Sequence, residues 1–157
     1  MISGQWSVSG GWCGIAVCAT ESSVSCHLGE RDVSIKNYRE LVVWQRAMDL
    51  VEIIYRVSRS FPKEELFALA AQLRRAAVSV PANIAEGQGR HTTKEFLHFL
   101  SIASGSLVET ETHVLIAERL NYVSHRVASE AIGLAAEVGR LTNGLVRSLR
   151  KRLPKPT

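Results

Sequence analysis

The chain has 157 residues, of which 46% are hydrophobic and 22% are charged, and its formal net charge is +4. This length and composition are enough for one domain with a packed core, and they exclude a protein that is disordered throughout. The positive charge belongs to the part after residue 34, because the first 34 residues hold one base, Arg31, against Glu21, Glu30 and Asp32.

Residues 1–34 are rich in Gly and Ser and show no helical period. We therefore expect a disordered tail. Organised sequence begins at "SIKNYRELVVWQRAMDL", and a valine codon can start translation in bacteria. We expect Val33 to be the true initiator and the tail to result from a misplaced start site.

The three cysteines, Cys13, Cys18 and Cys26, all lie in this tail. Their spacing lacks the paired C-x-x-C knuckles of a zinc site, so we predict no metal. A cysteine-free remainder suits a reducing cytoplasm. The apolar run "WCGIAVCA" has no basic segment before it and is too short to cross a bilayer, so we predict neither a signal peptide nor a membrane anchor.

From residue 35 to residue 153, apolar residues recur with the 3.6-residue period of amphipathic helices. Four stripes result: Leu41, Trp44, Met48, Val51 and Tyr55; Leu66, Leu69, Leu73, Ala77, Val80 and Ile84; Phe96, Leu100, Ala103, Leu107, Thr110, Val114 and Ala117; and Val127, Ala131, Leu134, Val138, Leu141 and Leu145. We predict one helix for each stripe.

The first two helix ends are marked by proline and glycine. Phe61-Pro62 should close the first helix, because proline restricts the residue before it. Gly87 and Gly89 should close the second with a left-handed residue.

The other boundaries carry capping residues. Thr92 with Glu95 matches a capping box for the third helix, Asn121 can stop that helix, and Ser124 can cap the fourth. Short connections make neighbouring helices antiparallel, so we predict an all-α up-down-up-down bundle over residues 35–153, with a short tail at 154–157.

The second helix has two unusual features. Pro81 lies in its interior, where it should destabilise the helix by about 3 kcal/mol unless something local offsets it. Many small alanines make this helix apolar on two faces, and a helix that is apolar nearly all round is normally buried all round. We therefore infer self-association.

Gly87-Gln88-Gly89-Arg90 invites comparison with a phosphate-binding loop. It follows a helix rather than a strand, and it lacks both the third glycine of a dinucleotide fingerprint and the Lys-Ser/Thr pair of a P-loop. A tight interhelical turn is the favoured interpretation, with Arg90 as a candidate phosphate contact.

Arg74 and Arg75 place two guanidinium groups on one turn of the second helix. Arg75 is a candidate ion-pair partner of Glu109 or Glu111, and the alternative is a nucleic-acid contact. Asn83 and Glu86 are expected to satisfy buried polar groups. Gly105, inside the third helix, is expected to mark a close helix contact, since an interior glycine otherwise destabilises a helix by about 1 kcal/mol.

Catalytic patterns are missing from the sequence. The histidines, His27, His91, His98, His113 and His125, form no H-E-x-x-H pair, and no serine lies in a nucleophile elbow. Glu109 and Glu111 face two directions of their helix, which does not suit a two-metal centre. We predict a protein that is not an enzyme and has no cofactor.

The strings "YRELVVWQRAMDLV", "LRRAAVSVPANIAEGQGR" and "EFLHFLSIASGSLVETETHVLIAERL" resemble small four-helix proteins encoded in intervening sequences of bacterial large-subunit ribosomal RNA genes. They are also similar to the accessory variability determinant of diversity-generating retroelements. The resemblance runs from about Tyr38 to Leu149, and typical members lack the first 34 residues.

The resemblance implies a barrel-like homopentamer with a basic surface and no enzymatic activity. In the retroelement relatives that surface is thought to engage nucleic acid and the reverse transcriptase. The candidates carried over for nucleic-acid binding are Arg74, Arg75, Arg90, Arg147, Arg150, Lys151 and Arg152.

Two functions from different classes follow. The first is a non-catalytic oligomer that binds RNA or an RNA–DNA hybrid as an accessory to another enzyme. The second is a self-assembling structural or protein-interaction module whose positive charge is incidental. Salt separates them, because phosphate binding weakens steeply with salt and an apolar interface does not.

Overall fold

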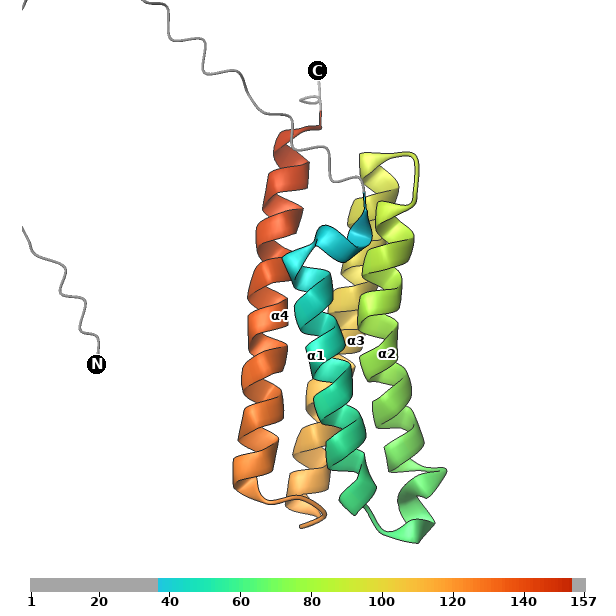
Figure 1. Ribbon diagram of the computed structural model, residues 1–157, viewed down its shortest axis with the longest axis vertical. Helices are drawn as coiled ribbons and strands as arrows, with labels where there is room; N and C mark the ends of the chain where they lie inside the picture. The colour runs from blue at the N-terminus through green and yellow to red at the C-terminus, as the bar shows by residue number, and fades with distance from the viewer. Residues whose placement is uncertain (1–36, 154–157) are drawn as a thin grey trace, which may run out of the picture. The chain divides into compact units, whose positions relative to one another are not determined.

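The structure is a computed structural model, and it describes residues 37–153. It contains α1 (Val42–Val57), α2 (Leu69–Gln88), α3 (Thr93–Arg119) and α4 (His125–Lys151), with short 3-10 turns η1 (Tyr38–Glu40), η2 (Ser58–Ser60) and η3 (Lys63–Leu66). Successive helices run antiparallel (Figure 1), and α4 returns to pack against α1. The predicted all-α bundle is confirmed. The predictions for residues 1–34 and 154–157 lie outside the described residues.

The core stripe of α3 was predicted without error. All seven of its residues are buried: Phe96, Leu100, Ala103, Leu107, Thr110, Val114 and Ala117. In α2 the stripe is confirmed from Leu73 onward, but Leu66 belongs to η3 and is exposed. In α4 the buried row is Ala128, Ala131, Ala135, Val138, Thr142 and Leu149, so Val127, Leu134, Leu141 and Leu145 only flank the core.

The stripe predicted for α1 was wrong beyond its first residue, Leu41, which is buried just before the helix. The buried residues of α1 are Val43, Ala47, Leu50, Ile54 and Val57, one position out of step with the prediction. Met48 and Tyr55 are exposed, while Trp44 and Val51 are half-buried against the core. Helix α1 is apolar on two adjacent faces, and periodicity alone does not tell which face meets the core.

The ends of α3 confirm two predictions. The hydroxyl of Thr92 accepts a hydrogen bond from the Glu95 amide at 3.2 Å and donates to the Glu95 carboxylate at 2.7 Å. Asn121 has a left-handed φ of 59°, and the amide of Tyr122 donates to the Ala117 carbonyl at 2.9 Å. This is the Schellman closure, in which a left-handed residue ends the helix.

The other boundaries agree only in part with the predictions. Helix α1 ends at Val57, and η2 continues the helical path to Ser60 just before Phe61. Ser124 occupies the N-cap position of α4, but its side chain makes no capping hydrogen bond. Gly89 ends α2 with a right-handed φ of −73°, so a left-handed closure is not what this glycine provides.

The close helix contact predicted at Gly105 is found at Gly87 instead. A Cβ on Gly87 would lie 2.7 Å from Phe99 Cβ and 2.8 Å from Phe96 Cδ2, so the side chain is missing because α2 and α3 approach closely there. The predicted contact at Gly105 is wrong within one chain, because a Cβ there would meet nothing within 4 Å.

No helix within residues 37–153 is long and apolar enough to cross a membrane.

Candidate nucleic-acid interface

The sequence-predicted bases separate into two groups in the fold. Arg90 follows α2, and Arg147, Arg150, Lys151 and Arg152 lie at the end of α4. The end of α2 and the end of α4 lie at the same end of the bundle (Figure 1). Arg74 and Arg75 lie in the first turns of α2, near the opposite end, so the seven candidates do not form one surface.

We call the end of the bundle that contains η1, the α2–α3 turn and the end of α4 the basic end. Its bases are Arg39, Arg90, Lys94, Arg147, Arg150, Lys151 and Arg152, and all are exposed. Its acids are Glu40, Glu86 and Glu95. Bases therefore outnumber acids about two to one, which gives this end a positive field.

The opposite end of the bundle is nearly balanced in charge. That half of the bundle holds the bases Arg56, Arg59, Lys63, Arg74, Arg75, Arg119 and Arg126, and they are accompanied by Glu52, Glu64, Glu65, Glu109, Glu111, Glu118 and Glu130. The positive charge of the chain is therefore concentrated at one end.

Arg74 has a structural role. Its Nε donates to the Ser58 hydroxyl at 2.7 Å, and its guanidinium carbon lies 5.3 Å from the centre of the Tyr55 ring. Ser58 is buried. Arg74 thus ties α2 to the end of α1, and its guanidinium is engaged within the fold.

Arg75 does not make the predicted ion pair with Glu109 or Glu111. Its Nη2 donates to the Gln72 side chain at 2.5 Å, one turn away on the same helix. No ion pair of Arg75 occurs among residues 37–153. Spacing along one helix could not place the acids of α3 relative to Arg75.

The polar residues of α2 near Pro81 confirm one prediction and correct another. The Asn83 amide donates to the Ser79 carbonyl at 2.7 Å, and the Ser79 hydroxyl accepts from Ser106 on α3 at 2.9 Å. Asn83 therefore satisfies half-buried polar groups in the proline-containing stretch, as predicted. Glu86 is exposed instead, and it pairs with Arg90.

Arg90 also stacks on an aromatic ring. Its guanidinium carbon lies 4.8 Å from the centre of the Phe99 ring. Its pairing with Glu86 offsets part of its charge, so the bases at the end of α4 are freer to meet a phosphate: within residues 37–153, Arg147, Arg150, Lys151 and Arg152 form no ion pair.

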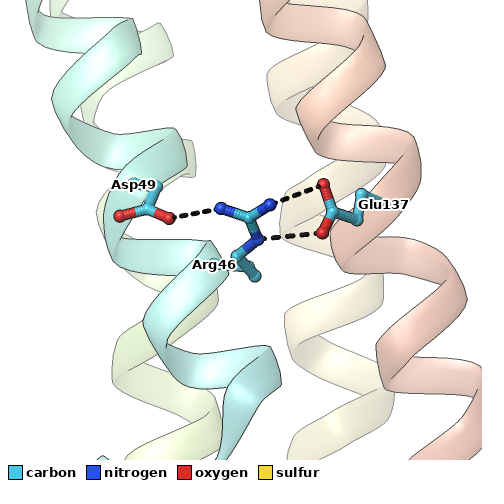
Figure 2. A network of polar contacts seen from close by, with 3 residues as sticks. All are labelled: Arg46, Asp49 and Glu137. Atoms are coloured by element: carbon cyan, nitrogen blue, oxygen red, sulfur yellow. Dashed lines mark hydrogen bonds and ion pairs between the residues drawn. The ribbon is translucent and has the colours of Figure 1, made fainter. Parts of the chain in front are cut away.

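The ion pair between α1 and α4 was missed at the sequence level. Arg46 donates from Nε to Glu137 at 2.8 Å and from Nη1 to Asp49 at 3.0 Å (Figure 2). The hydrogen bond to Glu137 is the main reason that the pKa of Arg46 is raised, and the bond to Asp49 adds to it. The spacing of Arg46 and Asp49 was a signal, but Glu137 is distant in sequence.

Apolar side chains cover much of the outside of α3. Ile102, Val108, Leu115 and Ile116 are exposed there, and we call them the α3 outer stripe. Gly105 lies among them on the outer face and is also exposed. A stripe of this kind is typical of a surface that another protein covers.

A second apolar surface runs between α1 and α2. This α1–α2 groove has a volume of about 270 Å³ and is lined by Tyr38, Trp44, Met48, Val78, Pro81, Ala82 and Ala85. It explains why the misplaced α1 stripe is apolar: Trp44 and Met48 line this groove on the outside of the bundle.

Metal ligands do not gather in the described part of the chain. Within residues 37–153 no group of three or more His, Cys, Asp or Glu side chains is placed to hold a metal ion. The prediction about the cysteines falls outside these residues.

One solved structure shares the fold of this chain. A crystal structure of a protein of unknown function from the S23 ribosomal protein family of Bacteroides thetaiotaomicron is similar, with a TM-score of 0.63 and 21% identity, over 67% of this chain and 98% of that one. No curated protein matches the sequence. Neither this relative nor the family below is described by an enzymatic activity. The model of the 23S rRNA-intervening sequence protein family matches residues 39–144, more than half of the 157 residues, and the chain belongs to this family.

Proposed function

We propose that this protein is a non-catalytic, self-associating bundle that binds RNA or an RNA–DNA hybrid through its basic end. One observation carries the proposal: the charge of the chain is concentrated where α4 ends, on exposed side chains without acidic partners among residues 37–153. Arginine and lysine in this arrangement bind phosphates and release counterions. Bases at a helix C-terminus also stabilise the helix dipole, so binding must be tested directly.

Self-association is supported by the apolar outside of the bundle. The α3 outer stripe and the α1–α2 groove lie on different helices of one chain. Two different complementary surfaces on one chain produce head-to-tail contacts, and such contacts close into rings when the rotation permits. A homopentamer, as the family resemblance implies, is a ring of this type.

The first experiment replaces the bases at the end of α4. Arg147→Gln, Arg150→Gln, Lys151→Gln and Arg152→Gln together should weaken RNA binding and leave the fold intact, since all four side chains are exposed. The slope of log affinity against log salt should fall by about 3, because each phosphate contact contributes roughly 0.7 to 0.9. Fluorescence anisotropy with labelled RNA at several salt concentrations measures both quantities.

A matched control removes the same charge from the other end. Arg56→Gln, Arg59→Gln, Lys63→Gln and Arg126→Gln should leave affinity and salt slope close to wild type. Equal losses in both variants would mean that net charge alone attracts RNA. Unchanged affinity in the first variant would remove the end of α4 from the site.

The competing function is a self-assembling module without a nucleic-acid role, which the apolar outer faces favour. Light-scattering mass of the full chain, alone and with RNA or an RNA–DNA hybrid, separates the two. An oligomer whose mass rises with ligand and falls back at high salt supports our proposal, and an oligomer that ignores both ligands supports the module. If the protein assists a reverse transcriptase, we expect it to bind the RNA–DNA hybrid at least as tightly as it binds RNA.

A further inference from the structure

A half-enclosed pocket lies between the end of α1 and the start of α4, away from the basic end. Its volume is about 320 Å³, at the lower end of the range for small-molecule sites. Apolar side chains of Ile53, Val57 and Val127 line it, and Val57 is buried. We call it the α1–α4 pocket.

Two guanidinium groups also line this pocket. Arg56 comes from α1 and Arg126 from α4, and both are exposed. Neither guanidinium lies within ion-pair distance of a carboxylate in residues 37–153, and neither donates a hydrogen bond to another residue in that range. Glu130 lines the same pocket but pairs with neither arginine.

The same pair of helices also contains an arginine whose guanidinium is paired with a carboxylate. Further along α1, Arg46 reaches across to α4 and is held by both carboxylate oxygens of Glu137, at 2.8 and 3.3 Å. Arg56 and Arg126 present the same planar donors to an open cavity. A guanidinium fork matches a carboxylate or a phosphate in two-point geometry.

The charge of the pocket selects between these two anions. Two arginines and one glutamate leave a surplus of one positive charge. A monoanion neutralises that surplus, whereas a dianionic phosphate ester would place a second negative charge beside Glu130. The apolar side chains call for a hydrocarbon body attached to the anion.

We propose that the α1–α4 pocket binds a small organic monocarboxylate with an apolar body, held at its headgroup by Arg56 and Arg126. This site does not depend on the nucleic-acid proposal, because it lies at the opposite end of the bundle. A ligand bound in this pocket would link the end of α1 to the start of α4, which the Arg46–Glu137 ion pair does not reach.

The test is isothermal titration of the full chain with phenylbutanoate. We expect saturable binding with a Kd of about 1 mM or tighter, the range that a ligand of this size reaches. Phenylbutanol, which lacks the charge, and acetate, which lacks the body, should each bind at least about tenfold more weakly. Failure of phenylbutanoate to saturate, or equal binding by all three compounds, would overturn the proposal.

Variants locate the site. Arg56→Gln with Arg126→Gln should weaken phenylbutanoate by about tenfold or more, while Arg59→Gln, nearby but outside the pocket lining, should change nothing. Glu130→Gln should tighten binding, because it removes the charge that opposes the ligand. The same loss in Arg59→Gln, or weaker binding in Glu130→Gln, would contradict the assignment. Wild-type binding of phenylbutanoate by the variant lacking the four bases of α4 would separate this site from the RNA site.

Discussion

Helices α3 and α4 are both 27 residues long and pack side by side, yet their outer faces are opposites. Helix α3 exposes four large apolar side chains on its outside, while none of the exposed large hydrophobics among residues 37–153 belongs to α4. Charged residues such as Arg126, Glu130 and Arg140 occupy the outside of α4 instead. Two helices that contribute to the same core can therefore have outer faces suited to different surroundings.

From this contrast we expect different neighbours for the two helices. An apolar outer face loses unfavourable contact with water when a second chain covers it. A charged outer face would lose hydration on burial. We therefore expect α3 to lie inside an assembly and α4 to remain in contact with solvent and phosphate.

The largest expected effect comes from a pair of glycines. Gly105 on α3 and Gly133 on α4 are both exposed, and a Cβ at either would meet nothing within 4 Å. Gly105→Leu should break the assembly, because a large side chain would prevent close approach of a second chain, whereas Gly133→Leu should leave it intact. Light-scattering mass distinguishes the two variants, and helical circular dichroism should stay unchanged in both. Loss of assembly in Gly133→Leu alone would reverse the roles of α3 and α4.

The second comparison concerns the two helix starts. Thr92 caps α3 through its side chain, while Ser124 occupies the same position in α4 without a capping bond. Thr92→Ala should therefore reduce the free energy of unfolding by about 1 kcal/mol. Ser124→Ala should change it by only a few tenths. Urea unfolding of both variants provides the values, and equal losses would show that Ser124 caps α4 in solution.

The smallest effect concerns the turn that joins α3 to α4. Partial burial raises the pKa of Tyr122, and the negative charge of Glu65 raises it further. The Tyr122 hydroxyl donates to the Glu65 carboxylate at 3.3 Å. Because the folded pKa lies above the unfolded one, this contribution to stability is complete below the unfolded pKa and is lost as pH rises through the folded pKa.

Ultraviolet titration of tyrosinate measures this shift. Tyr122→Phe identifies the contribution of Tyr122 among the three tyrosines, and Glu65→Gln should lower the pKa of Tyr122 towards its ordinary value. A Tyr122 titration that does not respond to Glu65→Gln would show that the hydrogen bond is absent in solution.

The sequence was a reliable guide to the core face of α3, because its spacing of three and four residues runs unbroken through the whole stripe. The α3 core stripe reads clearly against polar neighbours such as Glu109 and Glu111, and every residue of it is buried. In α1 a second apolar row lies beside the first, so the period was right and the face was wrong. Trp44 and Met48 of that second row line the α1–α2 groove.

The candidate site was only partly predictable, because some of its residues are neighbours in the chain and others come together only through the fold. Clustering of bases at the end of α4 is visible in the sequence, because those residues are neighbours in the chain. Their position at the same end of the bundle as Arg90 depends on topology, and the predicted antiparallel arrangement of the helices implies it. The ion pair of Arg46 with Glu137 joins two helices that are far apart in sequence, and Arg56 and Arg126 line one pocket from the same two helices. No local sequence pattern predicts either arrangement.

An even number of antiparallel helices brings residue 37 and residue 153 to the same end of the bundle (Figure 1). A fluorescent domain or affinity tag fused at either residue would therefore start at the basic end, where it would obstruct nucleic acid. The α3–α4 turn at Asn121 lies at the far end, so a circular permutant opened there, with residues 37 and 153 joined by a linker, would carry its label away from the basic end.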